Sequence, residues 1–147
     1  MEKAALKEHR RHSTADKPFS YYISNIPEYF PNAPMHWHKE FELNVILEGE
    51  GDFVTGDIHF TAYKGDIVLT PPDMLHAVYQ HDDKRCVYDT LDLDGSMLGS
   101  RDNGRAADAF IAPLISGAYS IETHITPEHC YYSELLTTAE NMISAAK

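Results

Sequence analysis

The chain has little cysteine and no long apolar run. Its 147 residues include only two cysteines, Cys86 and Cys130, which lie far apart in the sequence. Two distant cysteines make neither a disulfide framework nor a paired metal motif, so we expect reduced thiols in a cytoplasmic protein. No apolar segment approaches the roughly 18–20 residues that a membrane span needs. Residues 1–17 carry charges without a following apolar stretch, which excludes a secretory signal.

Basic residues are also scarce. The chain has 12 lysines and arginines against 23 aspartates and glutamates, and its formal net charge is −11. Such a surface repels phosphate backbones, so the chain itself is expected to bind nucleic acid poorly. Its basic cluster, KEHRRH at residues 7–12, lies in a polar arm of residues 1–17 that has no sustained periodicity. We expect this arm to be solvated or to form a frayed helix.

The residues after the arm alternate like short β-strands separated by turns. Turn signals such as Gly65 and Pro71-Pro72 recur along residues 18–93, and no helical pattern occurs before residue 100. This pattern predicts an antiparallel sandwich or barrel. The expected strands span residues 18–26, 36–48, 53–54, 58–63, 67–70, 75–80 and 86–93.

Helical periodicity enters the last third of the chain. Residues 106–115 predict a short helix, and residues 119–125 predict an extended segment. An amphipathic helix then begins at Pro127, with Thr126 as its expected N-cap, because apolar residues recur at spacings of three and four. The predicted fold class is therefore all-β with C-terminal helices. The expected units are the arm of residues 1–17, a β domain of residues 18–125 and a helix of residues 126–147.

One face of residues 36–44 (HWHKEFELN) concentrates groups that bind metals. Successive strand side chains point to opposite faces, so His36, His38 and Glu42 are expected to share a polar face opposite an apolar one. Imidazole and carboxylate form a good ligand set for divalent metals such as Zn, Ni, Fe or Mn. An adjacent strand offers His76 as a fourth ligand. The alternative is that these four side chains only hydrogen-bond to one another, without a metal.

The spacing of these residues resembles that of the cupin superfamily. The chain reads H-x-H-x3-E-x6-G from His36 to Gly49, and G-x5-P-x-D-x2-H from Gly65 to His76. The resemblance implies a cupin-type antiparallel barrel, or jelly roll, whose metal positions are the four residues above. The chain departs from the usual motifs at Phe30 and Asp73, where the superfamily has glycine, and at Gln80, where it has asparagine.

Three segments resemble, more specifically, the effector-binding half of AraC-type transcription regulators. They are MHWHKEFELNVILEGEGDF, KGDIVLTPPDMLHAVY and YDTLDLDGSML, and the resemblance covers roughly residues 18–147. It implies a non-enzymatic domain that binds a small molecule, for instance a sugar, inside the barrel. It also implies a homodimer formed through the C-terminal helix. An effector in the barrel would order the arm of residues 1–18, which is expected to close over the barrel mouth near His36 and Glu40. DNA would be bound only by a helix-turn-helix domain, which is expected beyond residue 147.

Inward-facing polar and aromatic side chains are the expected contacts of this small molecule. The candidates are Glu40, Asn44, Tyr22 and Tyr88. The competing function is a stand-alone metal-dependent cupin enzyme, such as a dioxygenase or a sugar isomerase. A centre of three histidines and one glutamate leaves open coordination positions for such chemistry. The sequence shows no further acid–base or nucleophilic set, which favours the regulator.

Overall fold

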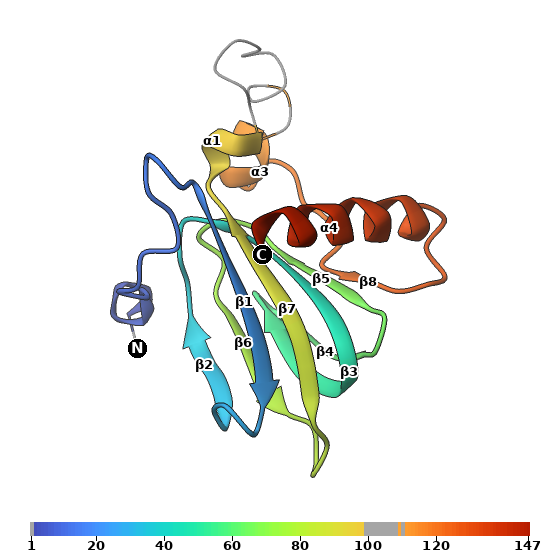
Figure 1. Cartoon of the computed structure of the whole chain (residues 1–147). Helices are drawn as coiled ribbons and strands as arrows, with labels where there is room; N and C mark the ends of the chain where they lie inside the picture. Colours follow the sequence, from blue (N-terminus) through green and yellow to red (C-terminus); the bar gives the residue numbers. More distant parts are fainter. Residues whose placement is uncertain (1, 99–108, 110) are drawn as a thin grey trace.

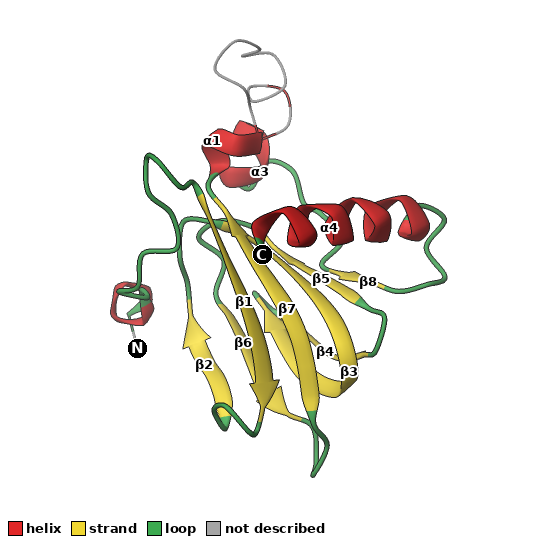
Figure 2. Cartoon of the chain, viewed as in Figure 1, coloured by secondary structure: helices red, strands yellow, loops and turns green. Residues whose placement is uncertain are grey.

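Antiparallel strands in two layers form the core of the computed structural model, which describes residues 2–98, 109 and 111–147 (Figure 1). The strands are β1 (Phe19–Ile26), β2 (Asn32–His36), β3 (Phe41–Thr55), β4 (Ile58–Tyr63), β5 (Ile67–Thr70), β6 (His76–Gln80), β7 (Cys86–Leu93) and β8 (His124–Ile125). The helical elements are a 3-10 turn at Lys3–Leu6, α1 (Gly95–Leu98), α3 (Ala112–Ile115) and α4 (Tyr132–Ala146) (Figure 2).

The long strand β3 belongs to both layers. Its first half pairs with β7 and β5, which extends a sheet in the order β1-β7-β3-β5-β8. Its second half pairs with β4 and β6, and β6 also pairs with β2. Among the described residues β1 and β8 each pair with one strand, so the ladder does not close into a continuous barrel. The expected class, antiparallel β with C-terminal helices, is confirmed.

A bend in β3, rather than a turn, carries the chain from one layer to the other. We expected residues 48–52 to separate two strands, but they remain paired, with a register shift between Ile46 and Glu48. Gly49 adopts a φ of +72°, and a Cβ atom there would lie 1.7 Å from the carbonyl oxygen of Arg85. Only glycine tolerates both this conformation and this close approach. Gly49, which was expected in a turn between two strands, therefore lies inside β3 and allows the strand to bend.

Alternation along β3 and β7 separates two apolar clusters. Ile46 and Tyr88 point into the space between the sheets, where they pack with Phe53, Val68 and other buried residues. The intervening side chains point outward, as the apolar face of residues 36–47 predicted. They pack under α4, which crosses the outer face of the first sheet (Figure 1). The outer cluster contains Leu43, Val45, Ile67, Leu91, Leu93, Ile125, Ala139 and Ile143.

Several predicted boundaries differ from the structure. The long strand begins at Phe41 instead of residue 36, and residues 32–35, which lie between the expected strands, form β2 together with His36. The helix expected from Pro127 begins at Tyr132, because Thr126 binds the Glu128 carboxylate and residues 127–131 form turns. Of the helix expected at residues 106–115, residues 106–108 and 110 lie outside the described residues, and Ala112–Ile115 form α3. In the described part of the chain, no helix has the length and apolarity needed to cross a membrane.

The N-terminal arm is packed against the β domain instead of being solvated. Lys7 and Trp37 form a parallel β-bridge, and the ring of His12 is only 6% exposed. The arm therefore lies beside the connection between β2 and β3, which carries His38 (Figure 1).

Candidate functional site

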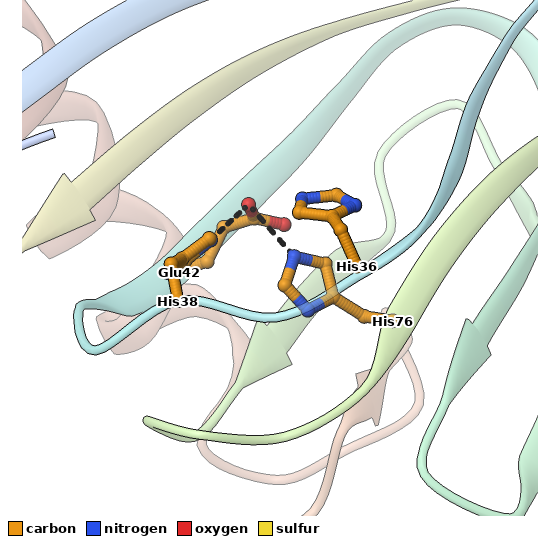
Figure 3. A group of neighbouring side chains, drawn as sticks. All are labelled: His36, His38, Glu42 and His76. Carbon is orange, nitrogen blue, oxygen red and sulfur yellow. Dashed lines mark hydrogen bonds and ion pairs between the residues drawn. The ribbon is translucent and has the colours of Figure 1, made fainter. Parts of the chain in front are cut away.

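Strand pairing brings together the four residues that the motif spacing singled out. His36 ends β2 and His76 begins β6, and the two are direct partners in the register of these strands. Their ring centroids are 4.1 Å apart. His38 lies in the connection that follows β2, and Glu42 lies near the start of β3. The prediction that His36, His38 and Glu42 share one strand was therefore wrong, although all four side chains converge (Figure 3).

The Glu42 carboxylate is the centre of the cluster. Its Oε2 atom lies 3.3 Å from His38 Nε2 and 3.5 Å from His76 Nε2 (Figure 3). Each of the four residues offers one ligand atom, and these atoms all lie within 4.8 Å of one another. His38, Glu42 and His76 are buried, and His36 is half-buried. The geometry thus has the compactness that a single cation requires.

Two of the imidazoles are oriented by backbone carbonyl groups. His36 Nδ1 donates to the carbonyl of Pro34 at 2.7 Å, and His76 Nδ1 donates to that of Met74 at 2.8 Å. These bonds leave the Nε2 lone pairs free to face the cluster, as carbonyl or carboxylate partners do for metal-bound histidines. His76 Nε2 is buried and has no hydrogen-bond partner. A buried ring nitrogen whose lone pair is free and faces the cluster is the feature that fits a divalent metal ion best.

Glu42 is held in its ionised form. Burial alone would raise the pKa of its carboxyl, but the nearby imidazoles of His76 and His38 outweigh burial and lower the pKa well below its ordinary value. Asn44 Nδ2 donates to Glu42 Oε1 at 2.6 Å, and Asn44 itself accepts a hydrogen bond from Thr90 Oγ1 at 2.6 Å. The carboxylate is therefore both charged and fixed in orientation.

Beside this cluster, a second charged group comes from the arm and from β7. His12 Nδ1 lies 2.8 Å from Asp92 Oδ2, and His12 Nε2 lies 2.8 Å from Glu8 Oε2. Burial lowers the pKa of His12, but the two carboxylates outweigh it and raise the pKa to about 11. Burial also raises the pKa of Asp92, against the opposing effect of His12. His12 is thus an imidazolium held between two acidic side chains.

Sequence reasoning missed this second group. Asp92 follows Tyr88 and Thr90 on the alternating, inward-facing set of β7, so alternation along residues 86–93 was the signal that could have identified it. No comparable local signal marked His12 or Glu8, because Asp92 and His36, which they also contact, lie far away in the sequence.

A cavity of about 470 Å³ opens beside both groups. Tyr22 and Tyr88, two of the expected ligand contacts, line it. The other two do not. Asn44 is 1% exposed and supports Glu42, whereas Glu40 accepts a hydrogen bond from Ser13 of the arm at 2.6 Å. The remaining lining includes Phe30, Val78, Glu8, Arg10, His12, His36, Glu42, His76, Thr90 and Asp92.

Comparisons with known proteins identify the family. Residues 20–101 match the family described as the AraC-like ligand binding domain. An 89-residue stretch is 27% identical to an uncharacterized HTH-type transcriptional regulator, YdeC, of Bacillus subtilis (strain 168). That match covers 60% of this chain and 31% of the regulator, so the chain spans about a third of its curated relative.

Similar solved structures include a cupin protein and an oxalate decarboxylase. A cupin protein from Bacteroides fragilis is 19% identical, with a TM-score of 0.48 over 52% of this chain and 66% of its own. The oxalate decarboxylase of Bacillus subtilis, described as having Mn(II) centres, is 20% identical, with a TM-score of 0.46 over 54% of this chain and 22% of its own. The family match spans more than half of the chain and includes all of the strands from β2 to β7. The chain belongs to the AraC-like ligand-binding domain family.

Proposed function

We propose that this domain binds a small-molecule effector in the cavity beside Glu42 and Asp92, and that binding controls a DNA-binding region of the same regulator. The cavity is the observation that carries the proposal. Its volume of about 470 Å³ lies in the range of small-molecule sites. Aromatic walls from Tyr22 and Tyr88 combine there with a few charged groups, which is the usual composition of such a site.

A divalent cation is proposed as part of the site. His36, His38, Glu42 and His76 would hold it, and Zn, Ni, Fe and Mn all suit such a ligand set. A cation bound there would offer open coordination positions to an oxygen or nitrogen atom of the effector. The chain's own contribution is to orient the imidazoles through Pro34 and Met74 and to keep Glu42 ionised.

The signal to DNA is proposed to pass through the arm and α4. An effector changes the arrangement of a protein only if it binds one arrangement more tightly than the other. The arm contributes Glu8, Arg10 and His12 to the cavity wall, so an effector in the cavity interacts with it directly. A homodimer through α4 would use the outward face of that helix, because its apolar stripe packs on the molecule's own sheet. Such a regulator would act in the cytoplasm.

The second candidate is a metal-dependent enzyme, a dioxygenase or a sugar isomerase. The observation that favours it is the arrangement of three histidines and one glutamate next to a cavity, which suits catalysis as well as sensing. The two candidates differ in the fate of the bound molecule. A regulator releases its effector unchanged, whereas an enzyme releases a product that chromatography or mass spectrometry detects.

Thermal unfolding in the presence of candidate effectors tests the proposal. A panel of sugars, hydroxy acids and amines would be screened with and without Zn²⁺ or Mn²⁺. At a concentration 100 times its dissociation constant, a true effector adds about 2.7 kcal/mol of stability. For a chain of this length that raises the melting temperature by roughly 5–10 °C. Tyr22→Ala should abolish the shift, and Tyr119→Ala, at a residue 55% exposed, should preserve it. A shift that persists in Tyr22→Ala would exclude this cavity as the site.

A further inference from the structure

Backbone hydrogen bonds hold the arm against the segment that carries two of the candidate ligands. The amide of Trp37 donates to the carbonyl of Leu6 at 3.1 Å, and the amide of Glu8 donates to the carbonyl of Trp37 at 3.0 Å. Trp37 lies between His36 and His38 in the sequence. Lys7 is the bridge partner of Trp37, and Glu8, the next residue of the arm, is therefore placed beside the cluster.

The side chain of Trp37 strengthens this attachment. Its Nε1 atom donates to the carbonyl of Lys3 at 2.7 Å. The ammonium groups of Lys3 and Lys7 lie 5.3 and 5.4 Å from the ring centroid, which is cation–π distance. Backbone pairing, an indole hydrogen bond and cation–π contacts thus fix the start of the arm together, independently of Glu8.

The carboxylate of Glu8 points at the cluster. Glu8 Oε2 lies 3.6 Å from His36 Nε2, close to the 3.3 and 3.5 Å that separate Glu42 Oε2 from His38 Nε2 and His76 Nε2. Ligand atoms at about 2.1 Å from one octahedral ion lie roughly 3.0 Å apart when adjacent and 4.2 Å apart when opposite. The distance from Glu8 Oε2 to His36 Nε2 falls within this range, and Glu8 also groups within 4.8 Å with His38 of the cluster and with His12 of the arm.

Glu8 is also held in place by a partner outside the cluster. His12 Nε2 lies 2.8 Å from Glu8 Oε2, and the other ring nitrogen of His12 lies 2.8 Å from Asp92 Oδ2. A hydrogen-bonded partner behind a carboxylate is the usual support of a carboxylate that binds metal. The remaining oxygen, Asp92 Oδ1, is buried without a hydrogen-bond partner, and Asp92 is 1% exposed, so the support is anchored deep in the fold.

We propose that Glu8 is a fifth protein ligand, supplied by the N-terminal arm, of the divalent cation held by His36, His38, Glu42 and His76. This inference rests on the cation site of the proposed function. It couples the cation to the arm, since each stabilises the other by the same factor. An effector atom that takes the coordination position of Glu8 then loosens the arm from Glu8 onward, beyond the part that Trp37 holds. The cation becomes the physical link between the cavity and the N-terminus.

Cation affinity is the first test. Co²⁺ would be titrated into the cation-free full chain and followed by calorimetry and by visible absorption, which reports coordination number. Glu8→Gln should weaken binding by about 10- to 100-fold and change the absorption spectrum. Glu8→Asp keeps the charge but shortens the reach, and should resemble Glu8→Gln. The matched control is Glu2→Gln, because Glu2 is exposed on the same arm and makes no side-chain capping bond.

Proteolysis of the arm is the second test, and it does not depend on spectroscopy. Arg10 and Arg11 are exposed and lie just after Glu8, so trypsin cleavage there reports release of the arm. Co²⁺ should slow cleavage of the wild-type chain by the same factor by which Glu8→Gln weakens Co²⁺ binding. In Glu8→Gln the cation should leave the cleavage rate unchanged.

The possible failures are distinguishable. If the wild-type chain binds no Co²⁺, both this inference and the cation part of the proposed function are wrong. If His38→Ala with His76→Ala abolishes binding while Glu8→Gln does not weaken it, only this inference is wrong. An equal loss in Glu2→Gln would show a general charge effect instead of coordination. Two bound cations, with one lost in Glu8→Gln, would mean that Glu8 belongs to a separate site with His12 and His38.

Discussion

Replacement of Ile143 by alanine tests whether α4 belongs to the core of one molecule or to an interface between copies. Ile143 is 4% exposed, and it packs in the outer apolar cluster with Leu43, Val45 and Leu91 of the first sheet. If these contacts are intramolecular in solution, the substitution must lower the stability of the monomer. If the helix instead packs against a second copy, the substitution must change association.

The size of the effect follows from the groups removed. Isoleucine to alanine removes three carbon groups, and each buried group is worth about 0.8 kcal/mol, so transfer alone gives about 2.4 kcal/mol. The strands under α4 are tied into the sheet and close only partly over the space, which adds a cavity cost. We expect a total loss of about 3–4 kcal/mol and a fall in melting temperature of roughly 6–16 °C.

Urea unfolding followed by circular dichroism measures this loss, and size-exclusion chromatography measures association. Ser144→Ala is the matched control, because Ser144 follows Ile143 on the same helix but is exposed. It should change stability by less than about 0.5 kcal/mol. A loss below about 1 kcal/mol in Ile143→Ala, together with a shift to smaller species, would refute the intramolecular packing of α4.

Three further outcomes are expected. His38→Ala combined with His76→Ala should remove the bound divalent cation, measured by elemental analysis, and leave the β-rich circular dichroism intact. Gly49→Ala should destabilise the fold by more than about 3 kcal/mol, because the added Cβ would lie 1.7 Å from the carbonyl of Arg85. Gly117→Ala is its control in thermal unfolding, since Gly117 has a similar φ of +76° but no atom within 4 Å of the added Cβ. Residues 1–147 alone, with a net charge of −11, should show no duplex DNA binding that falls steeply between 50 and 200 mM salt in fluorescence anisotropy.

Local alternation predicted the sheet faces because one burial pattern governs each strand. In β3, Leu43 and Val45 lie under α4 while Glu42 and Asn44 point inward, as period-2 alternation requires. Motif spacing likewise predicted which four residues converge. It did not predict which strands bring them together. The pairing of His36 with His76 depends on the register between β2 and β6, which no local pattern encodes.

Strand β2 was not predicted because its segment contains prolines. Pro31 and Pro34 lie between the expected strands of residues 18–26 and 36–48, and they favour a loop there because proline cannot donate to a strand ladder. Among the described strands, however, β2 pairs only with β6, and its register shifts between Ala33 and His36, where Pro34 lies. An edge strand with such an irregularity accommodates a missing donor. Sequence alone does not reveal whether a strand lies at an edge.

The arm was expected near His36 and Glu40, where Glu8 and Ser13 do lie, but its buried contacts were missed for a related reason. Its charged residues look solvated because, apart from the pair Glu8 and His12, no neighbour in the sequence contacts them. Their partners are Asp92 on β7 and the backbone of Trp37, which only the tertiary fold brings near. A basic, aperiodic segment and a segment that supplies buried charges to a cavity therefore have the same local signature. The two kinds of segment differ only in whether the fold places acidic residues beside them. Asp92 is the acidic residue that alternation along β7 could have identified.

The two buried carboxylates of the cavity have different partners, and this difference constrains the effector. Glu42 faces the imidazoles of His38 and His76, whereas Asp92 depends on His12 from the arm. A buried carboxylate without a partner is strongly unfavourable. Withdrawal of the arm removes His12 and leaves Asp92, which is 1% exposed, without its imidazolium partner. An effector that releases the arm must therefore bring Asp92 a hydrogen-bond donor of its own, as well as any atom that it offers to a cation beside Glu42. A molecule that presents a donor and an acceptor on neighbouring atoms meets both demands, and a purely apolar molecule meets neither.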